Sequence, residues 1–214
     1  YAIARDLEVT RFLNSKKINV FPHKDQVVFE ESEVVKDNGL PYTVFTPYKN
    51  KWLLKFKESL LSENKPLPNF YIFKTDFPSL QSIGFSESKI KVKPYTLSYL
   101  EQYDSIRDFP FIDQTSYVSP YLRFGLLSTR KLIKIALKTN ATYLSELIWR
   151  EFFMQILFHF PKVVTENFKR KYNQVEWRNN EDEFEKWCKG ETGYPIVDAG
   201  MRQLNETGYM HNRV

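Results

Sequence analysis

Residues 142–160 form a segment that is apolar around almost the whole circumference of the helix predicted by its spacing. Thr142 is a candidate N-cap, and Pro161 would end the helix at Phe160. A helix with no polar face is stable only when other elements cover it. The chain must therefore build its core around this segment, whose apolar residues are Tyr143, Leu144, Leu147, Ile148, Trp149, Phe152, Phe153, Met154, Ile156, Leu157 and Phe158.

Three further segments in the second half have helical periodicity with a recognisable start or end. Ser and Thr side chains cap helix starts, Pro suits a first turn, and Gly suits the left-handed residue after a last turn. These rules predict helices over 129–138 behind Ser128, over 181–189 ahead of Gly190, and between Pro195 and Gly208.

The first part of the chain has a different pattern. Residues 18–35 resemble short β segments, with Val27, Val28 and Phe29 as the buried part. From Glu30 to about Val92, turn and Pro signals interrupt the chain, apart from a helical stretch near 49–62. We therefore expect a mixed fold, with the end of an α/β unit over 1–33, a connector over 34–94 and an all-α domain over 95–214.

Composition excludes several classes of protein. The single cysteine, Cys188, rules out an internal disulfide framework, and His23, His159 and His211 lack the spacing of metal ligands. The seven glycines form neither a dinucleotide fingerprint nor a P-loop, and no run is long enough to cross a bilayer. We expect a cytoplasmic protein with no metal, whose net charge of +5 permits a polyanionic partner.

The apolar helix carries charges that need an explanation. Glu146 and Arg150 are four residues apart, with Trp149 along the same edge. One interpretation is an intrahelical ion pair worth about 0.3–0.5 kcal/mol. The other is a functional site, because a desolvated carboxylate is costly and tends to mark one. Spacing alone leaves both open.

Residues 113–120 place hydroxyl side chains and free backbone amides ahead of a helix with Pro120 in its first turn. Such a start can receive phosphate oxygens, helped by the helix dipole. The simpler interpretation is that Ser119 is an ordinary N-cap.

Several short sequence blocks are more informative than these single features, because they occur together in one order. They are Glu146–Phe153 (ELIWREFF), Thr192–Leu204 (TGYPIVDAGMRQL), Gly208–Arg213 (GYMHNR), Arg107–Pro110 (RDFP), Thr115–Ser119 (TSYVS) and Val44–Lys49 (VFTPYK). They closely resemble signature blocks of the DNA photolyase/cryptochrome family, in the family's order and spacing. The resemblance covers the middle of a family member, so we expect a fragment that lacks most of the antenna-type α/β domain and the rest of a helical FAD-binding domain.

The resemblance implies roles for individual residues. It assigns flavin adenine dinucleotide (FAD) contacts to Tyr103, Thr115, Ser116, Tyr117, Val118, Ser119 and Tyr143. It assigns the walls of a DNA lesion pocket to Glu146, Trp149, Arg150, Asn212 and Arg213, with Arg107 nearby on the DNA side. Glu146 and Asn212 would contact the lesion directly. Trp177 would be the outermost residue of a tryptophan relay that reduces the flavin.

The implied reaction is light-driven repair of UV-damaged DNA, in which excited reduced FAD donates an electron to a flipped-out cyclobutane pyrimidine dimer. With Asn212, the chain is similar to the class I enzymes that repair cyclobutane dimers, which have Asn at the matching position. A folate antenna is doubtful, because Tyr1-Ala2 stands where folate-using relatives have an Asn-Glu pair, so the second chromophore is unknown. We expect a monomer. The alternatives are a cryptochrome-like flavin photoreceptor without repair and a helical DNA-binding module without chemistry.

Overall fold

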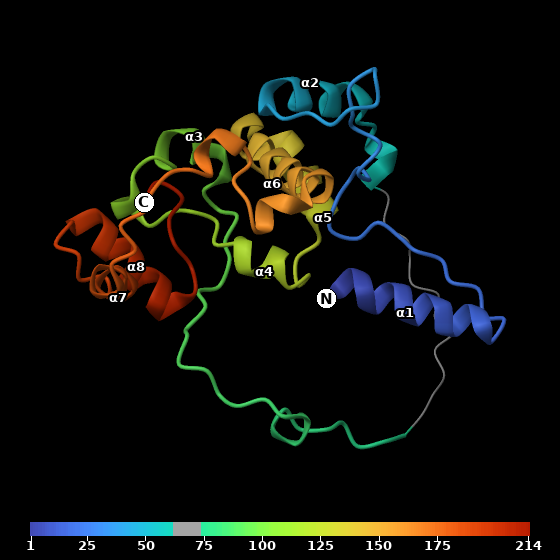
Figure 1. Cartoon of the computed structure of the whole chain (residues 1–214), viewed down its shortest axis with the longest axis horizontal. Helices are drawn as coiled ribbons and strands as arrows, with labels where there is room; N and C mark the ends of the chain where they lie inside the picture. Colours follow the sequence, from blue (N-terminus) through green and yellow to red (C-terminus); the bar gives the residue numbers. More distant parts are fainter. Residues whose placement is uncertain (62–73) are drawn as a thin grey trace.

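The computed structural model describes residues 1–61 and 74–214. In this part of the chain the regular structure is helical, apart from one isolated antiparallel bridge between Val35 and Pro41 (Figure 1). The α-helices are α1 (Ala2–Ser15), α2 (Phe45–Lys55), α3 (Tyr103–Ile106), α4 (Ser119–Arg123), α5 (Thr129–Thr139), α6 (Ala141–His159), α7 (Glu181–Lys189) and α8 (Pro195–Thr207). Short 3-10 helices cover Glu58–Leu61, Gln81–Ile83, Leu100–Gln102, Pro110–Ile112, Pro161–Val164 and Arg170–Tyr172.

The core forms around α6, which packs against α5 and α2 (Figure 1). Trp52 from α2 and Leu132 from α5 are completely buried. The expectation that α6 is covered all round is only partly right. Its other face remains open, with Phe153 61% and Phe158 57% exposed.

Helix ends follow the sequence closely. Ser128 caps α5 as predicted, and α7 and α8 end at Gly190 and Gly208 with φ of 70° and 69°. The prediction of Thr142 as the N-cap of α6 is wrong. Asn140 has that role, and its side chain accepts a 2.9 Å hydrogen bond from the Tyr143 N–H.

The predicted β segments over 18–35 are wrong, because this stretch has no strand. Side chains of α5 and α6 hydrogen-bond to the backbone of residues 24–31, where a strand would need a neighbouring strand. Val28 and Phe29 are nevertheless buried, as predicted. The sequence patterns did not predict helix α1, which contributes no residue to the core. The assignment of 1–33 to an α/β domain stays a prediction.

The expected connector contains α2, which begins before the predicted 49–62 stretch and ends at Lys55. Ser62 and the Lys65–Pro68 signal lie outside the described residues. After Lys74 the chain follows a long outer path without α-helix before it rejoins the helical body (Figure 1). Among the described residues, no helix is both long enough and apolar enough to cross a membrane.

Candidate functional site

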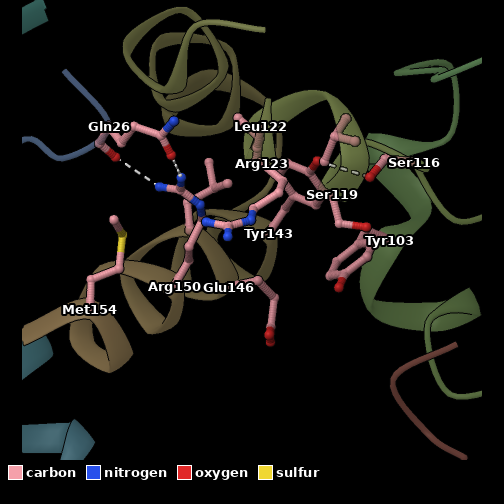
Figure 2. Close-up of a pocket in the computed structure, with 12 residues that line it drawn as sticks. Gln26, Tyr103, Ser116, Ser119, Leu122, Arg123, Tyr143, Glu146, Arg150 and Met154 are labelled. Atoms are coloured by element: carbon pink, nitrogen blue, oxygen red, sulfur yellow. Dashed lines mark hydrogen bonds between the residues drawn. The ribbon is translucent and has the colours of Figure 1, made fainter. Parts of the chain in front are cut away.

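A cavity of about 500 Å³ opens beside α6, and several of the residues singled out from the sequence line it (Figure 2). Side chains from the segment before α2, from α3, from the 116–123 segment and from α6 meet there. The lining consists of Gln26, Tyr103, Ser116, Val118, Ser119, Leu122, Arg123, Tyr143, Glu146, Leu147, Arg150 and Met154.

Two tyrosines form one side of the cavity. The rings of Tyr103 and Tyr143 meet edge to face at 4.9 Å, and the Tyr143 hydroxyl donates to Ser116 Oγ at 3.0 Å. Burial raises the pKa of Tyr103 and of Tyr143 to about 12. Both hydroxyls are therefore protonated at neutral pH and can act as hydrogen-bond donors.

The 115–119 segment has a fixed, irregular backbone. Tyr117 has a positive φ of 55°, which is uncommon for a residue with a side chain. The Thr96 N–H donates to Ser116 O at 3.0 Å, and the Tyr209 hydroxyl donates to Thr115 Oγ1 at 3.1 Å. The interpretation of Ser119 as an N-cap is wrong, because Val118 occupies the cap position and Ser119 is already helical.

Glu146 lines the cavity, and 29% of its side chain is exposed. Arg107 Nη1 donates to its Oε1 at 2.6 Å. Although burial alone would lower the pKa of Arg107, this hydrogen bond and the negative charge of Glu146 raise it. Glu146 therefore pairs with Arg107, the residue that follows α3, and not with Arg150. The intrahelical ion pair considered from the sequence does not form.

The fully buried carboxylate of α6 is Glu151, which the sequence analysis did not single out. It is 2% exposed and accepts hydrogen bonds from the Val28 N–H at 2.7 Å, the Phe29 N–H at 3.1 Å and Trp52 Nε1 at 2.9 Å. Burial outweighs these bonds and raises its pKa. Its position one turn after Leu147, on the apolar stripe, was the available sequence signal.

Arg150 points into the cavity wall and binds the N-terminal segment (Figure 2). Its two terminal nitrogens donate to Gln26 O at 2.7 Å and to Gln26 Oε1 at 2.6 Å. Burial lowers the pKa of Arg150. Gln26 was not predicted as a site residue, because nothing in its local sequence indicates contact with a residue 124 positions away.

Trp149 lies at the contact between α6 and α2. Its ring stacks on Phe45 with centroids 3.6 Å apart and planes 9° apart, and Phe153 packs near it at 5.4 Å. Trp149 is not among the residues that line the large cavity.

A second, smaller cavity of about 80 Å³ shares Tyr103 and Ser116 with the first. It brings the C-terminal residues Asn212 and Arg213 close to Arg107. Arg213 Nε donates to Asp108 Oδ1 at 2.6 Å. The remaining lining residues are Thr115, Tyr209 and His211.

Trp177 is separate from both cavities. It is 70% exposed and lies in the segment before α7, beside Arg178 and Phe184. The structure therefore brings most of the predicted residues together and leaves Trp177 at the surface. In residues 1–61 and 74–214, no three His, Cys, Asp or Glu side chains form a potential metal cluster.

Two family models match the chain. Residues 1–70 match the DNA photolyase model, and residues 143–214 match the FAD binding domain of DNA photolyase. Deoxyribodipyrimidine photo-lyases from Alkalihalophilus pseudofirmus and Escherichia coli align with 98% and 99% of the chain, at 33% and 32% identity. The chain belongs to the DNA photolyase family. It spans about half the length of the curated relatives it matches, since the alignments cover 49% of each of these two proteins.

The fold agrees with this photolyase assignment. A crystal structure of a bacterial class III photolyase from Agrobacterium tumefaciens superimposes with a TM-score of 0.72 at 28% identity, covering 98% of this chain and 49% of that one. The helical part is therefore a photolyase-family fold, and the model for its FAD binding domain begins at Tyr143, on the cavity wall.

Proposed function

We propose that the protein carrying this chain is an FAD-dependent photolyase that uses light to split cyclobutane pyrimidine dimers in UV-damaged DNA. The observation that carries the proposal is the cavity in which Tyr103, Ser116, Tyr143 and Glu146 meet, in a chain of the photolyase family. These residues come from three separate segments, so their convergence does not follow from a shared local motif.

The cavity suits a flavin nucleotide by the chemistry of its lining. Flavin and adenine rings need flat apolar contact, which Tyr103 and Tyr143 provide. Phosphate oxygens need donors, and the cavity offers hydroxyls of Ser116 and Ser119 together with the guanidinium of Arg123. We propose Thr115, Tyr117 and Val118 as further contacts, since they belong to the same backbone segment.

When bound, reduced FAD supplies an electron after it absorbs light. The residues of this chain would hold the substrate in place to receive it. A dimer weakens base stacking, so turning it out of the duplex costs only a few kcal/mol. As the dimer accepts charge, donors near its carbonyl oxygens stabilise it. The Asn212 amide and the Arg107 guanidinium are suitable donors. We propose that Glu146, which is bound by Arg107, contacts the lesion directly together with Asn212.

Trp149 and Arg213 would complete the DNA surface. With Phe45 stacked against it, the Trp149 ring is held in one orientation. Such a rigid aromatic group can pack against a base without losing much conformational entropy. We propose Trp177 as the surface residue that supplies electrons to oxidised flavin, because its exposure gives access to external reductants.

We also propose the domain limits 1–33, 34–94 and 95–214, with the first region as the end of an α/β antenna domain. The match of residues 1–70 to the DNA photolyase model supports the assignment of this region to a domain separate from the FAD-binding domain. We propose no folate antenna, because Tyr1 and Ala2 lack the polar groups that would bind a pterin. We also propose that the protein acts on damaged DNA as a monomer.

Repair by the full-length protein tests the proposal. The protein is loaded with FAD, reduced, and mixed with an oligonucleotide that carries one thymine dimer, under light and in the dark. We expect light-dependent return of intact thymines with no net consumption of reductant. FAD binding without any repair would favour a photoreceptor, and absence of FAD binding would overturn the proposed function altogether.

A further inference from the structure

Residues 24–31 form an irregular segment, here called the strap, whose main chain is bound by side chains of α5 and α6. Arg130 of α5 donates to Asp25 O at 2.9 Å and to Val27 O at 3.1 Å. Arg150 donates to Gln26 O, and Glu151 accepts from the N–H groups of Val28 and Phe29. Further along, His159 Nε2 lies 2.8 Å from Glu31 O. The strap is thus fixed along its length although it joins no sheet.

Gln26 is the residue of this strap that lines the large cavity. Its amide orientation is determined by its partner. A guanidinium has donors only, so the group that faces Arg150 must be the amide oxygen. The amide nitrogen then points away from Arg150, and Figure 2 shows it on the opposite side of the group. Within the described part of the chain, Gln26 Nε2 donates no hydrogen bond.

We propose that Gln26 is a ligand-binding residue of the cavity, whose amide nitrogen donates a hydrogen bond to an acceptor of bound FAD, and that Arg150 is the positioning residue that orients it. This inference rests on the proposed function, since FAD is the ligand proposed there. It also gives Arg150 a role other than contact with a DNA phosphate, because both of its terminal nitrogens already serve Gln26.

This arrangement suits ligand binding because one set of contacts fixes the strap and another orients the Gln26 side chain. The main-chain bonds from Arg130 and Glu151 fix where the strap runs. The second bond from Arg150 fixes which way the Gln26 side chain turns. A donor fixed in advance loses little rotamer entropy when the ligand arrives.

The decisive variant is Gln26→Glu. A carboxylate in the same place still accepts from Arg150, so the strap keeps its contacts, but the amide donor of position 26 is gone. Loss of one such hydrogen bond is expected to raise the Kd for FAD by about tenfold. The new carboxylate would also repel the FAD phosphates, so the Kd is measured at low and at high salt. Repulsion is screened at high salt, whereas the loss of the donor persists there. A residue with only a structural role would leave the Kd at high salt unchanged.

Two further variants separate the donor from general loosening of the strap. Arg130→Gln weakens the same strap without altering a cavity residue, and it should leave the Kd for FAD within about twofold. Arg150→Lys cannot bind both Gln26 oxygens in the same geometry, so the Kd should rise in this variant. In the double variant with Gln26→Glu, Arg150→Lys should raise the Kd by less than it does alone, because both changes weaken the same hydrogen bond to FAD.

The experiment is an FAD titration of the full-length apoprotein, followed by flavin fluorescence, with thermal unfolding of each apoprotein as the check on folding. A raised Kd at high salt in Gln26→Glu with an unchanged Tm supports the inference. A wild-type Kd at high salt in that variant would overturn it while the proposed function stands. Equal losses in Gln26→Glu and Arg130→Gln would also overturn it, since strap position alone would then explain binding. No FAD binding by the wild type would overturn both.

Discussion

Trp52 Nε1 donates a 2.9 Å hydrogen bond to Glu151 Oε1 at the contact between α2 and α6. The same carboxylate accepts from two backbone N–H groups of the strap, at Val28 and Phe29. One buried side chain therefore joins three parts of the chain that are far apart in sequence. This contact places the strap, and with it Gln26, against the helix that carries Glu146.

Replacing Glu151 by Gln should destabilise the protein although the shape is nearly the same. One end of the amide is a donor, and it would face a backbone N–H that now has no acceptor. An unsatisfied buried donor costs about 1–3 kcal/mol, which should appear in the free energy of unfolding measured with urea. Gln155→Met is the matched control, one turn along α6. Gln155 Oε1 is buried without a partner and Gln155 Nε2 makes only a long, 3.5 Å hydrogen bond to Phe29 O, so this change should cost much less than Glu151→Gln. Equal losses in the two variants would contradict the role of Glu151.

Asp198 should make stability depend on pH at acid pH. Hydrogen bonds from Thr192 and from the Gly193 N–H lower the pKa of Asp198 below its ordinary value of 3.8. The folded state therefore binds this proton less readily than the unfolded state, so the contribution is complete above pH 3.8 and is lost as the pH falls through the lower folded value. Urea unfolding at a series of pH values should show wild type and Asp198→Asn converging as the pH falls. A difference that stays constant with pH would refute this.

Arg213 and Arg150 should affect DNA binding in different ways. The Arg213 side chain is 42% exposed and its partner Asp108 lies at the surface, so it is available to a phosphate. Arg213→Gln should therefore reduce the slope of log K against log salt by about 1, for damaged and undamaged DNA alike. Arg150→Lys should leave the slope unchanged, because Arg150 binds Gln26. A reduced slope for Arg150→Lys would return that residue to the DNA surface.

Trp177→Phe in the full-length protein should slow light-driven reduction of oxidised flavin by at least about tenfold, since phenylalanine is much harder to oxidise, while DNA binding is retained. Absorbance at the flavin band during illumination gives the rate. Trp187→Phe is the control, because Trp187 is also partly exposed and stacks on Phe184 nearby. If both variants reduce flavin at the wild-type rate, Trp177 has only a packing role.

Asn212→Asp should lower the quantum yield of dimer splitting more than Asn212→Ala. An ionised carboxylate beside Tyr103 and Arg107 would repel the negative charge that develops on the dimer, whereas alanine only removes a donor. A penalty of about 1.4 kcal/mol would give a tenfold difference in yield, with partial recovery at low pH as the acid is protonated. Repair per absorbed photon, measured against pH, tests this. Equal losses without pH dependence would mean that residue 212 does not control charge in the site.

Local sequence rules predicted the second half of the fold well. The ends of α5, α7 and α8 depend on residues within one turn, and Ser128 and Gly190 behave as those rules require. The strap shows where such rules fail. Val27 and its neighbours have the composition of a strand, but their hydrogen-bond partners are side chains more than 100 positions away. Motif resemblance singled out Tyr103 and Ser116 for FAD and Glu146 for the lesion pocket, and the structure brings the three to one cavity. Gln26 and Glu151 could be found only from the three-dimensional contacts.

The way in which the strap is held affects how much sequence change the cavity can tolerate. Main-chain groups are the same for every residue except proline, so most of the bonds from Arg130, Arg150 and Glu151 do not depend on the side chain at position 26. That side chain can therefore be replaced while the backbone keeps its position. Substitutions at position 26 can therefore alter the lining of the cavity, and with it the ligand preference, without disturbing the rest of the fold.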